Sequence, residues 1–159
     1  MLDGLVAGAR DDAARRRQSR SLSDVEAAAV AAPPALDARA ALQRGANIKV
    51  IAEVKRASPS RGALAEIPDP ADLARSYAAG GAAAVSVLTE ERRFGGSLDD
   101  LSAVRAAVDI PVLRKDFIAE PYQVLEARAA GADLVLLIVA ALDDATLAQL
   151  HALVLEFGM

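Results

Sequence analysis

The sequence predicts an α/β fold in which a parallel β-sheet is covered by helices. After about residue 47, short apolar runs alternate with segments that carry helical start and stop signals. The runs are apolar at consecutive positions, as expected of strands buried on both faces. Parallel strands need crossover connections, and the intervening helices supply them. The four strand-like runs are Ile48–Val54, Ala83–Leu88, Pro111–Leu113 and Leu134–Val139.

The N-terminal segment predicts a helical extension ahead of this repeat. A helix is expected over Leu2 to about Arg17, whose basic end complements the helix dipole. Ser23 and Glu26 have the spacing of a capping box, which predicts the start of a second helix that ends before Pro33. A short helix near 38–44, ended by a glycine, follows. The predicted parts are therefore a helical extension, 1–46, and a strand–helix repeat, 47–159.

Each helix of the repeat has recognisable ends. Asp69 caps the first helix and Pro70 begins it, a combination favoured at helix starts. Ser97, with Asp100 three residues later, caps the second. Glycines stop the first, third and fourth helices. The predicted helices run from Pro70 to the Gly80–Gly81 pair, and over Leu98–Val108, Pro121–Ala130 and Asp144–Phe157.

Four strand–helix units fit two architectures: a small doubly wound sheet, or half of an eight-fold (β/α) barrel. A doubly wound sheet would favour a glycine-rich phosphate turn after the first strand. That position instead carries the sequence KRASPS at residues 55–60. In a barrel, functional side chains stand at the carboxyl ends of the strands.

Two lysines occupy such strand ends in a chain that hardly uses lysine. Of its 18 basic residues, only Lys49, Lys55 and Lys115 are lysines. Burial can lower the pKa of a lysine, which suits it to proton transfer, whereas an arginine keeps its proton. A charged residue at a strand end is commonly only solvated or paired. The shared position of Lys55 and Lys115 nevertheless makes both candidate functional residues.

Strand alternation groups further side chains with these lysines. Glu53 and Lys55 point the same way, because successive side chains of a strand alternate between faces. The same rule groups Leu113 with Lys115, and also Ser86, Leu88 and Glu90. In a barrel, two lysines and two carboxylates would share one pocket at the carboxyl rim. Burial and a nearby carboxylate shift a lysine pKa in opposite directions, so each lysine could be an acid or an anion contact.

Composition and charge exclude several function classes. The net charge of −4 argues against nucleic-acid binding, which normally needs a basic excess. The absence of cysteine excludes disulfides and cysteine-ligated zinc. The sequence has neither an apolar run of about 18 residues nor an export signal, so we expect a cytoplasmic protein without a membrane partner. The acidic pairs 99–100 and 143–144 suit helix starts and need no metal.

Four segments resemble, in order, the N-terminal half of indole-3-glycerol phosphate synthase. They are IAEVKRASPS (51–60), SVLTEERRFGGS (86–97), IPVLRKDF (110–117) and GADLVLLIVAAL (131–142). The resemblance covers about residues 2–159 and implies the N-terminal (βα)4 portion of a TIM (β/α)8 barrel, with a helical N-terminal extension. That family closes the indole ring of 1-(2-carboxyphenylamino)-1-deoxyribulose 5-phosphate, with loss of carbon dioxide and water. It uses no metal and no organic cofactor.

The resemblance also implies a role for each matched residue. Lys115 matches the general acid that protonates the substrate's ketone oxygen while the aromatic carbon attacks. Glu53 matches a carboxylate that hydrogen-bonds a substrate hydroxyl and takes part in proton handling. Lys55 matches a cation that contacts the substrate's carboxylate or phosphate. The implied substrate-binding residues are Ser58 in the first loop, Phe94 and Phe117 around the anthranilate ring, and Leu136 and Ile138 on the apolar floor.

The sequence departs from the family pattern after its fourth unit. A barrel of this type has roughly 250 residues, and the family's later glutamate, asparagine and phosphate-binding amides have no match here. We therefore expect an N-terminal fragment with little or no activity alone, whose open strand edges favour self-association.

Two other functions stay open from the residues alone. One is a Schiff-base barrel lyase with Lys55 or Lys115 as nucleophile, which borohydride would trap with a carbonyl substrate. The other is a non-catalytic half-barrel subunit, which would form a discrete dimer and gain no activity when mixed with the missing half.

Overall fold

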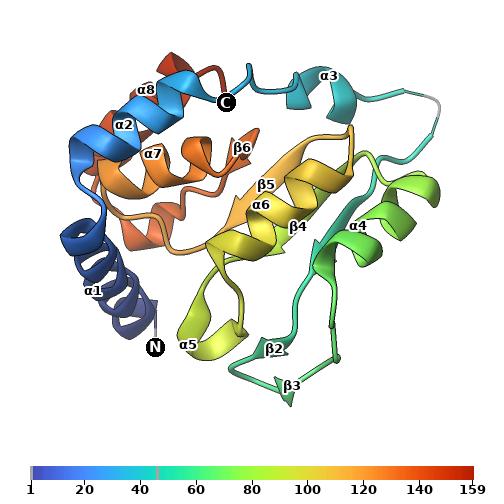
Figure 1. Ribbon diagram of the computed structural model, residues 1–159, viewed down its shortest axis with the longest axis horizontal. Helices are drawn as coiled ribbons and strands as arrows, with labels where there is room; N and C mark the ends of the chain where they lie inside the picture. Colours follow the sequence, from blue (N-terminus) through green and yellow to red (C-terminus); the bar gives the residue numbers. More distant parts are fainter. Residues whose placement is uncertain (1, 46) are drawn as a thin grey trace.

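The computed structural model describes residues 2–45 and 47–159, and its centre is a four-stranded parallel sheet (Figure 1). The strand order is β1 (Ile51–Val54), β4 (Ala84–Leu88), β5 (Val112–Lys115) and β6 (Leu134–Val135). Each neighbouring pair in this sheet is parallel. The predicted α/β class and the parallel pairing are therefore confirmed.

Three helices cover one face of this sheet: α4 (Pro70–Ala79), α6 (Leu98–Ala107) and α7 (Pro121–Ala129). Their buried side chains pack on alternate strand residues, which leaves the other positions of each strand facing the opposite side. The strand members of this core are Val54, Val85, Val87 and Val112, and the helix members are Ala74, Leu101, Val104 and Ala127. The face that carries Glu53 and Lys115 is thus the one without these helices.

The predicted caps of α4 and α6 are confirmed by their hydrogen bonds. Asp69 accepts a bond of 2.8 Å from the backbone N–H of Ala71, and Ser97 accepts one of 3.0 Å from Asp100. Helix α8 (Asp144–Glu156) has Asp143 as its N-cap. It packs on α7 through Leu150 and Val154, together with Ile118 and Val124.

The N-terminal part contains α1 (Leu2–Ser19), α2 (Leu22–Ala31) and α3 (Ala38–Leu42). Helices α1 and α2 pack on α7, where Ala13, Val25 and Ala29 meet Tyr122 and Leu125. No helix in the described residues is both long and apolar enough to cross a lipid bilayer.

Two predicted boundaries in this part are wrong. The capping box is formed by Ser21 and Asp24 instead of Ser23 and Glu26: each side chain accepts a 3.2 Å bond from the other residue's backbone N–H. Helix α1 ends at Ser19, so Ser21 already has the extended backbone that an N-cap requires. Helix α3 ends at Leu42, before the expected glycine. The predicted part boundary at residue 46 lies outside the described residues.

The strand boundaries also differ from those predicted, because hydrogen-bond partners decide them. The first strand begins at Ile51, where pairing with β4 begins, and β5 continues to Lys115. In the described sheet β6 is an edge strand that pairs with β5 at two positions only. Residues 136–138 of the predicted fourth strand are in neither a strand nor a helix, and Val139 begins the 3₁₀ turn η1 (Val139–Ala141).

Small elements that the sequence did not predict gather at the carboxyl end of the sheet. Strands β2 (Ala57–Ser58) and β3 (Gly62–Ala63) form an antiparallel hairpin after β1, and helix α5 (Glu91–Phe94) follows β4. In Figure 1 the hairpin and α5 lie at one end of the sheet, with α1 beside them, and α3 lies at the other. This end is where the predicted site residues stand.

Candidate active site

Glu53, Lys55 and Lys115 meet at the carboxyl ends of β1 and β5. The Nζ atom of Lys55 lies 2.6 Å from Oε1 of Glu53. The Nζ atom of Lys115 lies 2.9 Å from Oε2 of the same carboxylate. Each carboxylate oxygen therefore receives one ammonium group. The structure brings together the three side chains that alternation grouped, while their catalytic roles stay predictions.

The register of the sheet explains this meeting. Strand β4 lies between β1 and β5, with Ser86 opposite Glu53 and Leu88 opposite Lys115. Lys115 therefore reaches across β4 to Glu53, and Ser86 contributes its hydroxyl at 3.5 Å from Oε2 of Glu53. From helix α4, the Tyr77 hydroxyl donates a 3.3 Å bond to the backbone carbonyl of Glu53. The carboxylate is thus held through both its side chain and its backbone.

The charges of this cluster reinforce one another. Burial alone would raise the pKa of Glu53, but the hydrogen bonds and positive charges of Lys55 and Lys115 outweigh burial, and the pKa is lowered. Glu53 is therefore ionised at neutral pH. The side chains of Lys55 and Lys115 are 34% and 36% exposed, which leaves room for an anionic ligand to approach both.

Glu90 does not join this cluster, so the prediction of two carboxylates in one pocket is wrong. Its Oε2 atom accepts bonds of 2.7 Å and 3.0 Å from the backbone N–H groups of Arg93 and Phe94. Glu90 is thus the N-cap of α5. Alternation fails at this residue because β4 ends at Leu88 and the chain then turns into a helix.

Two predicted substrate-binding residues lie together. The ring centroids of Phe94 and Phe117 are 6.3 Å apart with an interplanar angle of 46°, a tilted aromatic pair. Ser58 is half-buried on β2, and Leu136 and Ile138 are half-buried after β6. No hydrogen bond within the described part of the chain joins Ser58 to the Glu53 cluster.

Arg56 is a residue at this end that the sequence analysis missed. Its side chain donates to the carbonyl of Ile67 at 3.2 Å, to the carbonyl of Gly95 at 3.3 Å, and to both carboxylate oxygens of Asp100. These bonds hold the loop after β1 against the loop after β4. Arg56 lies between β1 and β2 and belongs to neither strand, so strand alternation gave no signal for it.

Arg114 and Asp116, on either side of Lys115, were also missed. Both side chains are buried, and they form an ion pair of 2.9 Å. A charged residue inside the apolar run of β5 was the signal, because alternation sends Arg114 to the helix-covered face.

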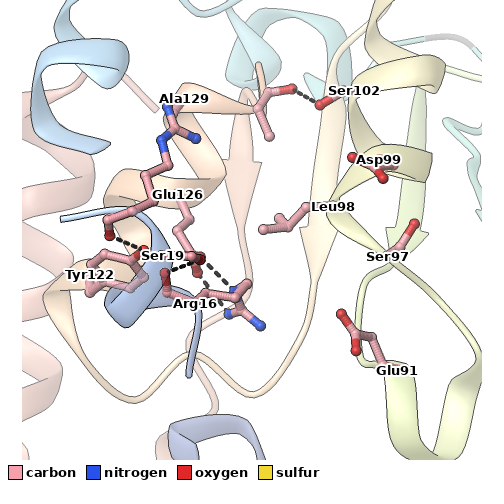
Figure 2. Close-up of a pocket in the computed structure, with 12 residues that line it drawn as sticks. Arg16, Ser19, Glu91, Ser97, Leu98, Asp99, Ser102, Tyr122, Glu126 and Ala129 are labelled. Atoms are coloured by element: carbon pink, nitrogen blue, oxygen red, sulfur yellow. Dashed lines mark hydrogen bonds and ion pairs between the residues drawn. The ribbon is translucent and has the colours of Figure 1, made fainter. Parts of the chain in front are cut away.

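A separate cavity of about 360 Å³ lies between α1, α6 and α7 (Figure 2). Its lining includes Arg16, Asp99, Tyr122 and Glu126 but none of the predicted site residues. Figure 2 shows Arg16 turned toward Glu126, and the two are joined by bonds of 2.6 Å and 2.8 Å. Among residues 2–45 and 47–159, no three His, Cys, Asp or Glu side chains are grouped as metal ligands.

The fold and the cluster define a class: a parallel α/β protein in which one carboxylate and two ammonium groups stand together at the carboxyl ends of the strands. A family model described as indole-3-glycerol phosphate synthase matches residues 2–159. The chain belongs to the indole-3-glycerol phosphate synthase family, which confirms the resemblance found in its motifs.

Curated relatives named indole-3-glycerol phosphate synthase match the whole chain of 159 residues. The identity is 69% to the protein of Leifsonia xyli subsp. xyli, 65% to that of a Nocardioides species, and 62% to that of Mycobacterium avium. The chain spans 61% of the length of the first two relatives and 58% of the third.

Proposed function

We propose that this chain supplies the first half of an indole-3-glycerol phosphate synthase. In this proposal residues 47–159 are the first four βα units of a (β/α)8 barrel, and residues 1–46 are its helical extension. The supporting observation is that α4, α6 and α7 pack on one face of the sheet while the lysines occupy the other. A barrel has this arrangement, whereas a doubly wound sheet carries helices on both faces.

The proposed reaction is ring closure of 1-(2-carboxyphenylamino)-1-deoxyribulose 5-phosphate, with loss of carbon dioxide and water. Lys115 protonates the ketone oxygen as the aromatic carbon attacks the carbonyl carbon. Glu53 orients Lys115 through the 2.9 Å ion pair and accepts a hydrogen bond from a substrate hydroxyl. Lys55, on the other oxygen of Glu53, contacts the substrate's carboxylate or phosphate.

The observation that carries this proposal is one carboxylate with an ammonium group on each oxygen. A positioned cationic acid stabilises the charge that develops on a carbonyl oxygen, most strongly in a water-poor site. Proton transfer from such an acid contributes about 10²- to 10⁴-fold to a rate. The reaction needs neither a metal nor an organic cofactor, as the family resemblance implies.

Apolar side chains supply the other half of the chemistry. We assign the tilted pair Phe94 and Phe117 to the anthranilate ring, with Leu136 and Ile138 below it. Apolar walls of this kind hold the ring against the carbonyl group, so that a flexible substrate is kept in the geometry that ring closure requires. Ser58, on the hairpin after β1, is assigned to the rim of the same site.

The test is to join this chain to the remaining C-terminal segment of the Leifsonia relative and to follow indole fluorescence. Lys115→Met is expected to lower kcat by about 10²- to 10⁴-fold, because the acid is lost. Lys49→Met is the matched control, since Lys49 is exposed and lies outside the cluster, and its activity is expected to stay unchanged. Activity that survives Lys115→Met would remove Lys115 from the acid role.

Borohydride separates the Schiff-base lyase from this proposal. The indole-forming reaction passes through no lysine adduct, so treatment with borohydride and the keto substrate is expected to leave the protein mass unchanged. A stable adduct on Lys55 or Lys115 would favour the lyase instead.

A further inference from the structure

Arg114 is a fully buried cation directly before Lys115. Its side chain is 1% exposed and lies on the face of β5 opposite to Lys115. A buried charge is costly unless it is paired and hydrogen-bonded. The guanidinium meets this need by donating to the Thr89 hydroxyl at 3.1 Å, to the Gln123 carbonyl at 2.7 Å and to Oδ2 of Asp116 at 2.9 Å.

Asp116, directly after Lys115, completes this ion pair. Its Oδ2 atom accepts a 2.6 Å bond from the Thr89 hydroxyl, and its Oδ1 atom accepts a 2.8 Å bond from the backbone N–H of Phe117. Burial alone would raise the pKa of Asp116, but Arg114 and these hydrogen bonds lower it. Both flanking residues of Lys115 are therefore charged and fixed.

These bonds also hold the backbone on both sides of Lys115. The N–H of Thr89 donates a 3.0 Å bond to the carbonyl of Lys115 itself. Gln123 donates to the carbonyl of Phe117 at 3.1 Å and accepts from the N–H of Ala119 at 2.8 Å. The backbone from residue 114 to residue 119 is thus tied to the end of β4 and to α7.

The same network reaches helix α1 through Glu126 of α7. Oε2 of Glu126 lies 3.5 Å from Nη1 of Arg114, and Arg16 of α1 binds both oxygens of Glu126 (Figure 2). A second contact of α1, between Asp12 and Arg92, is separate from this network. Ion pairs through Glu126 therefore connect one face of α1 to β5, the strand that carries the proposed acid.

We propose that the ionic network of Arg16, Glu126, Arg114, Asp116 and Thr89 positions Lys115, so that docking of helix α1 fixes the placement of the proposed acid. The inference rests on the proposed function of Lys115. These residues contact neither substrate nor reacting atoms and act as positioning residues. Loss of Arg16 removes its two short bonds to Glu126 and leaves the 3.5 Å contact between Glu126 and Arg114, which weakens the support that α1 gives to β5.

The test uses the lysine side chains as reporters, because the chain has only Lys49, Lys55 and Lys115. Each gives a separate signal in a protein labelled with ¹³C at the lysine Cε, and single Lys→Arg variants assign the signals. Arg16→Met is expected to move the Lys115 signal and leave that of Lys49 in place. The matched control is Arg17→Met on the same helix, which removes the cation over the Tyr122 ring but no network bond. A Lys115 signal that stays in place in folded Arg16→Met, or moves equally in Arg17→Met, would overturn the proposal.

Asp116→Asn provides a second variant of nearly the same shape. In the joined enzyme, it is expected to lower kcat by up to about 10²-fold while KM stays unchanged, since a misplaced acid slows only the chemical step. In the 159-residue chain the same substitution is expected to move the Lys115 signal. A Lys115 signal that does not move would contradict the positioning of Lys115 by the network. If the unsubstituted joined enzyme forms no indole, the proposed function fails, and the lysine spectra still decide the positioning.

Discussion

At the scale of single residues, strand β5 gives neighbouring charges opposite surroundings. Lys115 lies half-exposed beside Glu53, while Arg114 and Asp116 are buried under the helices. The open side leaves the Lys115 ammonium group accessible, and the closed side holds the backbone from which that group extends. Because side chains alternate along β5, the proposed acid and the residues that hold its backbone lie on opposite faces of the same strand.

The buried Asp116 makes the chain sensitive to acid. Its pKa is lowered despite burial, chiefly by the charge of Arg114. A carboxyl whose pKa is depressed on folding stabilises the protein above its unfolded pKa, and this stability is lost as the pH falls through the folded value. We expect the free energy of unfolding to decline below about pH 4, and to decline less steeply in Asp116→Asn. Urea unfolding between neutral and acidic pH measures how steeply the free energy of unfolding declines in each protein. Equal slopes in the parent and in Asp116→Asn would contradict this role of Asp116.

Residue-level prediction from sequence succeeded within strands and at the first residue after β1, and it failed further beyond a strand end. Glu53 and Lys115 lie in β1 and β5, Lys55 directly follows β1, and the structure brings the three side chains together. Glu90 lies beyond the last residue of β4, where alternation no longer applies, and its carboxylate caps α5. The Arg114 network needed Glu126 and Arg16, whose proximity depends on the packing of α1 and α7 and not on local spacing.

At the scale of elements, the turn after α5 depends on a close approach of two backbones. A Cβ atom on Gly96 would lie 1.9 Å from the carbonyl oxygen of Leu88, the last residue of β4. That oxygen belongs to the backbone of a buried strand, which cannot turn aside as the end of a flexible side chain can. Glycine is therefore required at position 96 if α5 and the Phe94 ring are to keep their places.

Gly96→Ala is expected to lower the free energy of unfolding by about 2 to 3 kcal/mol, because the strand end must shift. Gly4→Ala is the matched control, since a Cβ there meets nothing within 4 Å and alanine favours a helix. It is expected to be neutral or to stabilise by up to about 1 kcal/mol. Urea unfolding of both variants measures the difference, and a Gly96→Ala protein as stable as the parent would refute the close approach.

Elements were predictable where their signals are local. Asp69 and Ser97 begin α4 and α6 as expected, because a cap acts on N–H groups two or three residues away. The capping box expected at Ser23 and Glu26 lies at Ser21 and Asp24 instead, directly after the end of α1. The hairpin β2–β3 and the short pairing of β6 depend on partners that local patterns do not specify.

At the scale of the whole molecule, the distribution of helices is the most informative feature. The helices that cover the sheet pack on one face, and the polar cluster occupies the other. The sequence left a doubly wound sheet and a half barrel open, because strand–helix alternation is common to both. The choice between the two folds depends on which face of the sheet each crossover helix covers. The packing of the helices on one face favours the barrel that we propose.

The most direct test of the shared carboxylate is the ¹³C lysine spectrum of Glu53→Gln. Glutamine keeps the shape of glutamate but removes the charge that binds both ammonium groups. We predict that the signals of Lys55 and Lys115 both move, while that of Lys49 stays in place. If only one lysine signal moves, if neither moves, or if all three move equally, the two lysines do not share Glu53 and the proposed site is wrong.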